Sequence, residues 1–281
     1  MKKPLRERLV ARPVRNKFAL DAIDPADTDS MTKARAARDL QKEADRLYHL
    51  QERMYAEGKR SLLLVLQGTD TSGKDGTVSH VIGAMNPQGC KITSFKEPTA
   101  EEKRHNFLWR IRRALPPPRY VGVFNRSHYE EVGIVRVHNL VTPSVWRARY
   151  ETINNFEREV ARRGTTIVKV FLHISFEEQT RRLLARLDDP TKHWKFDPKD
   201  VAERDYWSDY IAAYSDAIGR CSTNVAPWYV VPADNKWYRN WAVARLLIET
   251  LKEMDPQYPQ PKLPIKKLKA KIKSQRPAAR A

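Results

Sequence analysis

The sequence contains few cysteines and no long apolar run. Its two cysteines, Cys90 and Cys221, lie 131 positions apart without a Cys-x-x-Cys or Cys/His spacing, which argues against a disulfide or a metal site and favours buried free thiols. No stretch approaches the roughly 18 consecutive apolar residues of a membrane span, and the N-terminus has no apolar signal-peptide core. These absences predict a cytoplasmic protein without a membrane partner.

Positive charge, by contrast, is in excess, with a net charge of +18 over 281 residues. Most of it lies at the ends: residues 1–20 carry a net +6 and residues 261–281 a net +8. A polyanion track in the body would therefore require local clustering of basic residues. We divide the chain into a basic N-terminal extension (1–32), a globular domain (33–255) and a basic C-terminal tail (256–281), which would be an amphipathic helix or a flexible segment.

Apolar runs alternate with helical patterns throughout the globular domain. Asp29 or Ser30 is expected to cap its first helix. The predicted strands are 61–67, 91–95, 120–124, 166–174 and 228–231. The predicted helices are 33–57, 73–84, 99–114, 143–163, 175–187, 199–218 and 236–254. This alternation predicts an α/β fold in three α/β/α layers, with a central parallel sheet of about five strands.

The most informative segment joins the first predicted strand to the next helix. Its Gly68-x-x-x-x-Gly73-Lys74 spacing matches a Walker A loop, in which backbone N–H groups surround phosphate oxygens and the lysine reaches the terminal phosphates. The next residue is Asp75, where a standard loop has Ser or Thr to bind Mg²⁺. Asp70, inside the loop, can supply the hard oxygen ligand that Mg²⁺ requires. The loop therefore predicts phosphate chemistry with an unusual metal anchor.

Polar residues also follow the predicted strand at 120–124. Arg126 lies just past its carboxyl end, the edge at which open parallel sheets bind ligands. Together, Lys74 and Arg126 would surround a transferring phosphoryl group with positive charge. The alternative for Arg126 is a surface salt bridge.

Five ordered motifs between residues 35 and 255 resemble the polyphosphate kinase 2 family. They are Gly68–Gly76, Asn86–Gly89, Ser94–Pro98, Phe124–Glu130 and Asp189–Lys195. The resemblance implies a P-loop kinase of thymidylate-kinase-like fold that transfers a phosphate between inorganic polyphosphate and a nucleotide. It also implies Mg²⁺ as the cofactor, with Mn²⁺ as the alternative, and a helical lid at about 176–200.

The resemblance implies roles for individual residues. Asp70 binds the metal, and Lys74 and Arg126 complete the catalytic set. The expected phosphate- or nucleotide-binding residues are Gly68, Thr71, Gly73, Asp75, Gly76, Lys96, Arg110, Asn125, Arg182 and Arg186. Asn125 stands where many members have Asp, so it would reach Mg²⁺ only through its carbonyl or a water. That form resembles the branch accepting both nucleoside mono- and diphosphates.

The sequence thus predicts Mg²⁺-dependent phosphoryl transfer between polyphosphate and AMP or ADP, by a homo-oligomer that is a dimer or tetramer. One alternative is an ATP-dependent nucleotide kinase of the same fold. Another, suggested by the basic tails, is a nucleic-acid-binding protein with a vestigial loop. Outside these roles, His128 is expected to be structural and Trp194 to pack in the core.

Overall fold

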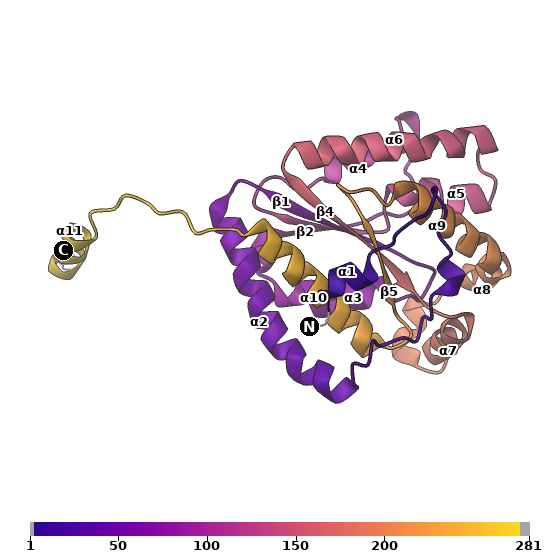
Figure 1. Ribbon diagram of the computed structural model, residues 1–281, viewed down its shortest axis with the longest axis horizontal. Helices are drawn as coiled ribbons and strands as arrows, with labels where there is room; N and C mark the ends of the chain where they lie inside the picture. Colours follow the sequence, from indigo (N-terminus) through magenta and orange to yellow (C-terminus); the bar gives the residue numbers. More distant parts are fainter. Residues whose placement is uncertain (1–2, 276–281) are drawn as a thin grey trace, which may run out of the picture.

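A five-stranded sheet organises the computed structural model, which describes residues 3–275 (Figure 1). Its strand order is β2-β3-β1-β4-β5, and every neighbouring pair is parallel. All the strands therefore end at one edge, and the predicted parallel α/β architecture is confirmed. The strands are β1 (Ser61–Gln67), β2 (Cys90–Ser94), β3 (Val121–Asn125), β4 (Thr165–His173) and β5 (Trp228–Pro232).

Each face of the sheet has its own hydrophobic core. In β1, Leu62, Leu64 and Leu66 belong to one core, whereas Leu63 and Val65 belong to the other. Because both faces are covered, the strand is a continuous apolar run rather than an alternating one. The first core is covered by α2 (Lys33–Glu57), α3 (Lys74–Val81) and α10 (Lys236–Met254), and the second by α4 (Trp109–Ala114), α6 (Pro143–Arg162) and α9 (Trp207–Cys221).

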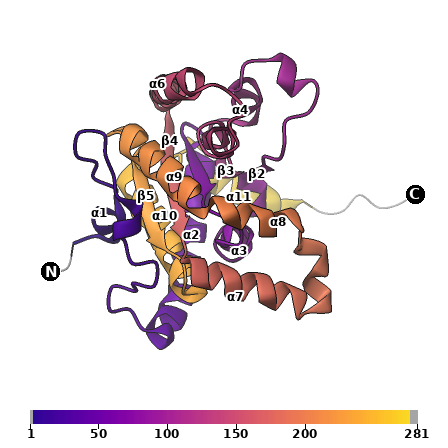
Figure 2. The same cartoon turned by 90° about the vertical axis from the view of Figure 1, so that its right-hand side faces the viewer.

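Other elements are short or lie outside these layers. Figure 2 views the molecule from the end at which α7 and α8 lie. The remaining helices are α1 (Leu5–Leu9), α5 (Ile134–Val137), α7 (Phe176–Leu187), α8 (Lys199–Ala202) and α11 (Ile265–Ser274). Short 3₁₀ segments occupy Leu20–Ala22, Ile82–Ala84, Pro87–Gly89, Glu102–Arg104, His128–Glu131, Pro190–Lys195 and Glu203–Tyr206. None of the helices in the described part of the chain could cross a membrane.

The two basic ends of the chain are arranged differently. Near the N-terminus, Leu5 and Leu20 are buried, and Ala11 N–H donates to the carbonyl of Trp228 in β5 (2.8 Å). Beyond α10, in contrast, the chain leaves the body and ends in α11, none of whose residues is buried (Figure 1). Residues 1–2 of the predicted extension and 276–281 of the predicted tail lie outside the described residues.

Three predictions about helices are wrong in detail. The cap of α2 is Thr32, whose Oγ1 accepts from Arg35 N–H at 3.3 Å, because Asp29 and Ser30 adopt positive φ in the preceding turn. The predicted helix at 99–114 is a 3₁₀ turn followed by α4, and Asn106 stabilises the turn between them by accepting from Leu108 N–H (2.9 Å). The predicted helix at 199–218 is divided into α8, a 3₁₀ segment and α9.

A buried polar network joins the sheet to the residues that follow β3. Lys169 of β4 donates to Glu157 of α6 (2.5 Å), to the hydroxyl of Tyr129 (2.7 Å) and to the carbonyl of Cys221 (2.7 Å). His128 lies 3.2 Å from the same glutamate, and burial lowers its pKa. His128 is thus structural, as expected, and the network fixes the turn after Arg126.

Candidate functional site

The loop between β1 and α3 has the geometry of a phosphate-binding loop. Gly68 has a φ of +152°, and a Cβ at this position would lie 2.7 Å from both the Leu172 carbonyl and Ser72 Oγ. Only glycine therefore lets the loop turn so closely over β4. The Oγ1 atoms of Thr69 and Thr71 are buried and have no hydrogen-bond partner within residues 3–275. Buried polar atoms normally have partners, so this loop is suited to a polar ligand.

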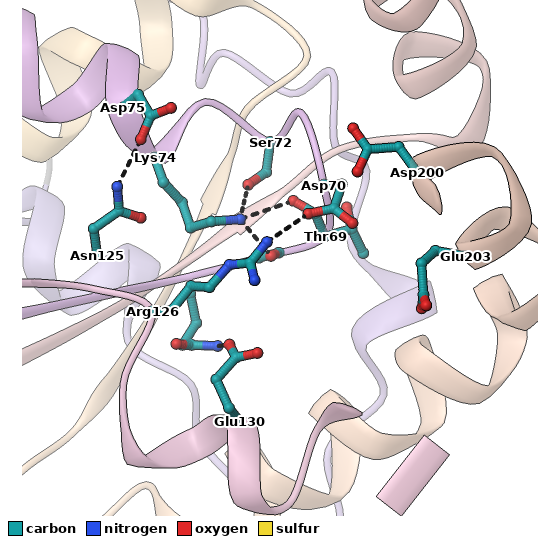
Figure 3. Close-up of polar contacts among 12 residues, drawn as sticks. Thr69, Asp70, Ser72, Lys74, Asp75, Asn125, Arg126, Glu130, Asp200 and Glu203 are labelled. Carbon is teal, nitrogen blue, oxygen red and sulfur yellow. Dashed lines mark hydrogen bonds and ion pairs between the residues drawn. The ribbon is translucent and has the colours of Figure 1, made fainter. Parts of the chain in front are cut away.

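Lys74 begins α3 and turns back into the loop (Figure 3). Its ammonium donates to the carbonyls of Gly68 (2.8 Å) and Thr69 (3.1 Å). Burial lowers its pKa, and so does the neighbouring Arg126. The Lys74 ammonium is thus held inside the loop. There, phosphate oxygens could replace the two carbonyl oxygens as its hydrogen-bond partners.

Arg126 faces the loop from the end of β3. The parallel register places Leu66 of β1 opposite Asn125, so the segments after both strands begin side by side. The guanidinium of Arg126 donates to the Asp70 carboxylate at 3.0 Å. Burial opposes its charge, but Glu130 and Asp70 raise its pKa. The structure therefore brings Asp70, Lys74 and Arg126 together, and the salt bridge of Arg126 is made within the loop.

The two departures from expected motifs contact each other. The side-chain amide of Asn125 donates to the Asp75 carboxylate at 2.6 Å (Figure 3). With Ser or Thr at position 75, Asn125 would donate to a neutral hydroxyl instead of a charged carboxylate. With aspartate at position 125, two carboxylates would lie side by side and repel each other. With its nitrogen occupied, Asn125 keeps its carbonyl oxygen for another partner.

A partly open pocket of about 190 Å³ lies between this loop and the segment 197–214. Arg126 and Glu130 are on one side, and Trp207, Tyr210 and Tyr214 supply an aromatic side. The opposite wall carries three carboxylates that the sequence analysis missed: Asp197, Asp200 and Glu203. Their three-residue spacing was the only signal in the sequence, and it is a weak one because Asp197 lies before α8, Asp200 in it and Glu203 in the 3₁₀ segment that follows. We call these three residues the acidic wall.

The pKa of Asp200, in the acidic wall, is raised. Burial is the largest cause and the charge of Asp70 the next, and together with Asp197 they outweigh the attraction of Arg186, so the pKa is about 6. Asp70 and Asp200 therefore repel each other when both are ionised. A cation between the loop and the wall would relieve this repulsion.

The four other predicted basic residues do not line the pocket. Lys96 is exposed, and Arg110 donates to its carbonyl at 2.8 Å while stacking on Phe95. On the predicted lid, Arg186 donates to the Lys195 carbonyl (3.1 Å) and pairs with Asp200 (3.3 Å).

Arg182, the other predicted lid arginine, is buried. It donates to the Thr71 carbonyl (2.8 Å), the Ala233 carbonyl (2.6 Å) and Glu178 (2.6 Å). With its donors occupied in this way, Arg182 supports the loop and does not point at a phosphate. Trp194 is 79% exposed, so the expectation that it packs in the core is wrong.

Comparisons with known proteins agree with this geometry. The family model of polyphosphate kinase 2 matches residues 30–259. A protein of Meiothermus ruber named AMP/ADP-polyphosphate phosphotransferase is 47% identical over 90% of this chain and 95% of its own length. One of Rhodopseudomonas palustris named ADP-polyphosphate phosphotransferase is 44% identical over 79% of this chain and 81% of its own. The crystal structure of polyphosphate kinase 2 from Arthrobacter aurescens TC1 superposes with a TM-score of 0.93 at 46% identity, covering 97% of this chain and 98% of that one.

Replacing Asp200 with asparagine should stabilise the protein at neutral pH. The pKa of Asp200 is raised from 3.8 to about 6 in the folded state, so the folded protein binds this proton more tightly than the unfolded chain. The ionised Asp200 carboxylate therefore destabilises the folded protein, and this effect is absent below about pH 4 and complete above about pH 6. Allowing for solvent screening, we expect Asp200→Asn to raise the free energy of unfolding by about 1 kcal/mol at neutral pH.

Urea unfolding of the wild type and Asp200→Asn at pH 4 and pH 7.5 measures this effect. The matched control is Asp209→Asn, an exposed carboxylate in the first turn of α9. A free-energy difference that is the same at both pH values would contradict the assignment.

Proposed function

The chain belongs to the polyphosphate kinase 2 family, and from this premise we propose that it transfers a phosphoryl group between inorganic polyphosphate and a nucleoside mono- or diphosphate. The observation that carries the proposal is the meeting of Asp70, Lys74 and Arg126 at one phosphate-binding loop. AMP and ADP are the proposed acceptors, because the Meiothermus ruber relative is named for both. The products would be ADP and ATP.

The chain's own residues would act mainly by charge and position. Phosphoryl transfer requires little acid–base chemistry, and its transition state spreads negative charge over the equatorial oxygens. Lys74 and the N–H groups at the start of α3 bind the phosphates held in the loop. Arg126 reaches the group in transit from the neighbouring strand. Its ion pair with Asp70 keeps the guanidinium at the loop before substrates bind.

Mg²⁺ is the proposed cofactor, and the donor set fits it. Asp70 offers carboxylate oxygen at the loop, and Asn125 offers its carbonyl, directly or through a water. Mg²⁺ typically takes one or two carboxylates and completes its coordination with substrate phosphates and waters, which this donor set allows. Bound there, Mg²⁺ would neutralise charge on the phosphates. Mn²⁺ prefers the same oxygen ligands.

We propose that the acceptor binds in the pocket beside Arg126. Its aromatic side chains Trp207, Tyr210 and Tyr214 provide surfaces against which a base can pack. The pocket volume of about 190 Å³ is smaller than the range of ligand sites, about 300–1,000 Å³. We therefore propose that the acidic wall moves outward when a nucleotide enters; Asp197 and Asp200 lie within the lid predicted at about 176–200, and Glu203 lies just beyond it.

Assays with two acceptors test the activity. With Mg²⁺ and long-chain polyphosphate, the purified protein should form ATP from ADP and ADP from AMP, measured by luciferase and by chromatography. A folded protein with no product from either acceptor would refute the proposal. Product formed only when ATP is the donor would favour the ATP-dependent kinase, and nucleic-acid binding that survives Lys74→Ala, without turnover, would favour the third alternative.

Asp70→Asn tests the metal site separately. The amide keeps the shape of the side chain but removes its charge, so kcat should fall by about 100-fold or more, and half-maximal rate should require more Mg²⁺. Asp209→Asn serves as the charge-matched control. A wild-type rate and Mg²⁺ dependence in Asp70→Asn would exclude Asp70 as the metal ligand while leaving the transfer activity standing.

We also propose a homo-oligomer, a dimer or tetramer. It is supported by Ile265, Leu268 and Ile272, which are 50%, 40% and 68% exposed along one stripe of α11. Such a stripe is stabilised when it packs against another apolar surface. Light scattering should give a multiple of 32.7 kDa for the full chain and a lower mass after removal of residues 256–281; a monomeric full chain would contradict the proposal. The cytoplasmic location stays a prediction from the sequence.

A further inference from the structure

A buried arginine lies against the phosphate-binding loop without a counter-ion. Arg239, in the first turn of α10, is only 3% exposed. Its Nε and Nη2 both donate to the side-chain oxygen of the adjacent Asn240, at 3.1 and 2.8 Å. For its Nη1 there is no hydrogen-bond partner between residues 3 and 275, and no described carboxylate forms an ion pair with it. The positive charge is therefore buried and uncompensated.

The guanidinium occupies the space beside two loop glycines. A Cβ on Gly73 would lie 2.6 Å from Arg239 Cζ, and one on Gly76 would lie 2.8 Å from Nη2. Gly73 also has a φ of +102°, which disfavours other residues. The absence of a side chain at Gly73 and Gly76 thus leaves the space that the guanidinium of Arg239 occupies. The charge lies directly behind the N-terminus of α3, the part of the loop that binds anions.

Neighbouring side chains add to the excess of positive charge around Arg239. Burial and the positive charge of Arg182 lower the pKa of Arg239 to about 10, which leaves it fully protonated at neutral pH. Arg182 itself pairs with Glu178 and donates to the Thr71 carbonyl of the same loop. The side of the loop formed by these two arginines therefore carries an excess cation. A buried charge that lacks a partner is unfavourable until an opposite charge approaches it.

We infer that Arg239 is a positioning residue whose counter-ion is the phosphate bound in the loop. It acts by packing its guanidinium against Gly73 and Gly76 and through the field that it adds to the N-terminus of α3. The inference rests on the proposed function only in taking the anion to be a chain of inorganic phosphates. Arg239 therefore lowers the stability of the free protein and contributes to binding once phosphate is present.

A packing role for Arg239 predicts the opposite result. An arginine that only fills space contributes equally with and without ligand, and its replacement destabilises both forms. The two roles are therefore separated by comparing stability without ligand and affinity for ligand in the same variants.

Inorganic tripolyphosphate is the probe for this comparison. Thermal unfolding without ligand and calorimetric titration with tripolyphosphate are measured for the wild type, Arg239→Met and Arg239→Lys. The control is Arg245→Met on the same helix, whose arginine pairs with Glu43 and Glu249. We expect Arg239→Met to unfold at or above the wild-type temperature and to bind with a Kd raised about tenfold. Arg239→Lys, which keeps the charge, should recover much of the affinity, and Arg245→Met should keep the wild-type Kd.

Two outcomes would overturn the inference. One is a wild-type Kd in Arg239→Met. The other is a loss of stability in Arg239→Met together with no recovery of affinity in Arg239→Lys. If the methionine variant does not fold, the affinity of Arg239→Lys alone decides the case. Because binding and turnover are measured separately, wild-type protein that binds tripolyphosphate without transferring phosphate would contradict the proposed function and leave the role of Arg239 intact.

Discussion

The parallel pairing of β1 with β3 is the constraint on which the site depends. It places Leu66 opposite Asn125 and lets Arg126 N–H donate to the Leu66 carbonyl at 3.1 Å. The phosphate-binding loop and Arg126 therefore start from adjacent points of one sheet edge, although they are more than 50 residues apart in the chain. Without this pairing, the loop would have Lys74 but no second cation at its mouth, and Asp70 would lose its partner at 3.0 Å. The buried network around Lys169 and Glu157 holds the turn after Arg126 against the same sheet.

The charges around the loop are divided between its two sides. The pocket side carries Asp70, Glu130 and the acidic wall, with Arg126 and Lys199 among them, so carboxylates are in excess there. The side toward α7 and α10 carries Arg182 and Arg239. Because Arg182 and Arg239 are buried, the second side offers a polyanion no direct contact, but its positive charge adds to the field at the N-terminus of α3. The two sides of the loop therefore differ in the sign of the charge that they carry.

The sequence predicts those parts of the site that depend on local patterns. Apolar runs, capping residues and the Gly68–Lys74 spacing are readable within a few positions, and parallel topology then implies that Arg126 meets the loop. The acidic wall was missed because its position depends on the path of the irregular segment between α7 and α9. Arg239 was missed for a similar reason: it lies 166 positions beyond Gly73, and only the packing of α10 on α3 brings them together. Arg182 was assigned to phosphate because sequence cannot show that backbone carbonyls occupy its donors.

Asp75 and Asn125 look like two separate departures from familiar motifs, yet they form one contact of 2.6 Å. A carboxylate at 75 is tolerated beside β3 because position 125 is a neutral donor, and the amide at 125 is held in place because position 75 accepts its hydrogen bond. An aspartate at 125 would turn this contact into a repulsion that only a proton or a cation could relieve. The pair therefore keeps negative charge at the loop without a second free carboxylate, so in the proposed Mg²⁺ site Asp70 would be the carboxylate that compensates the charge of the metal.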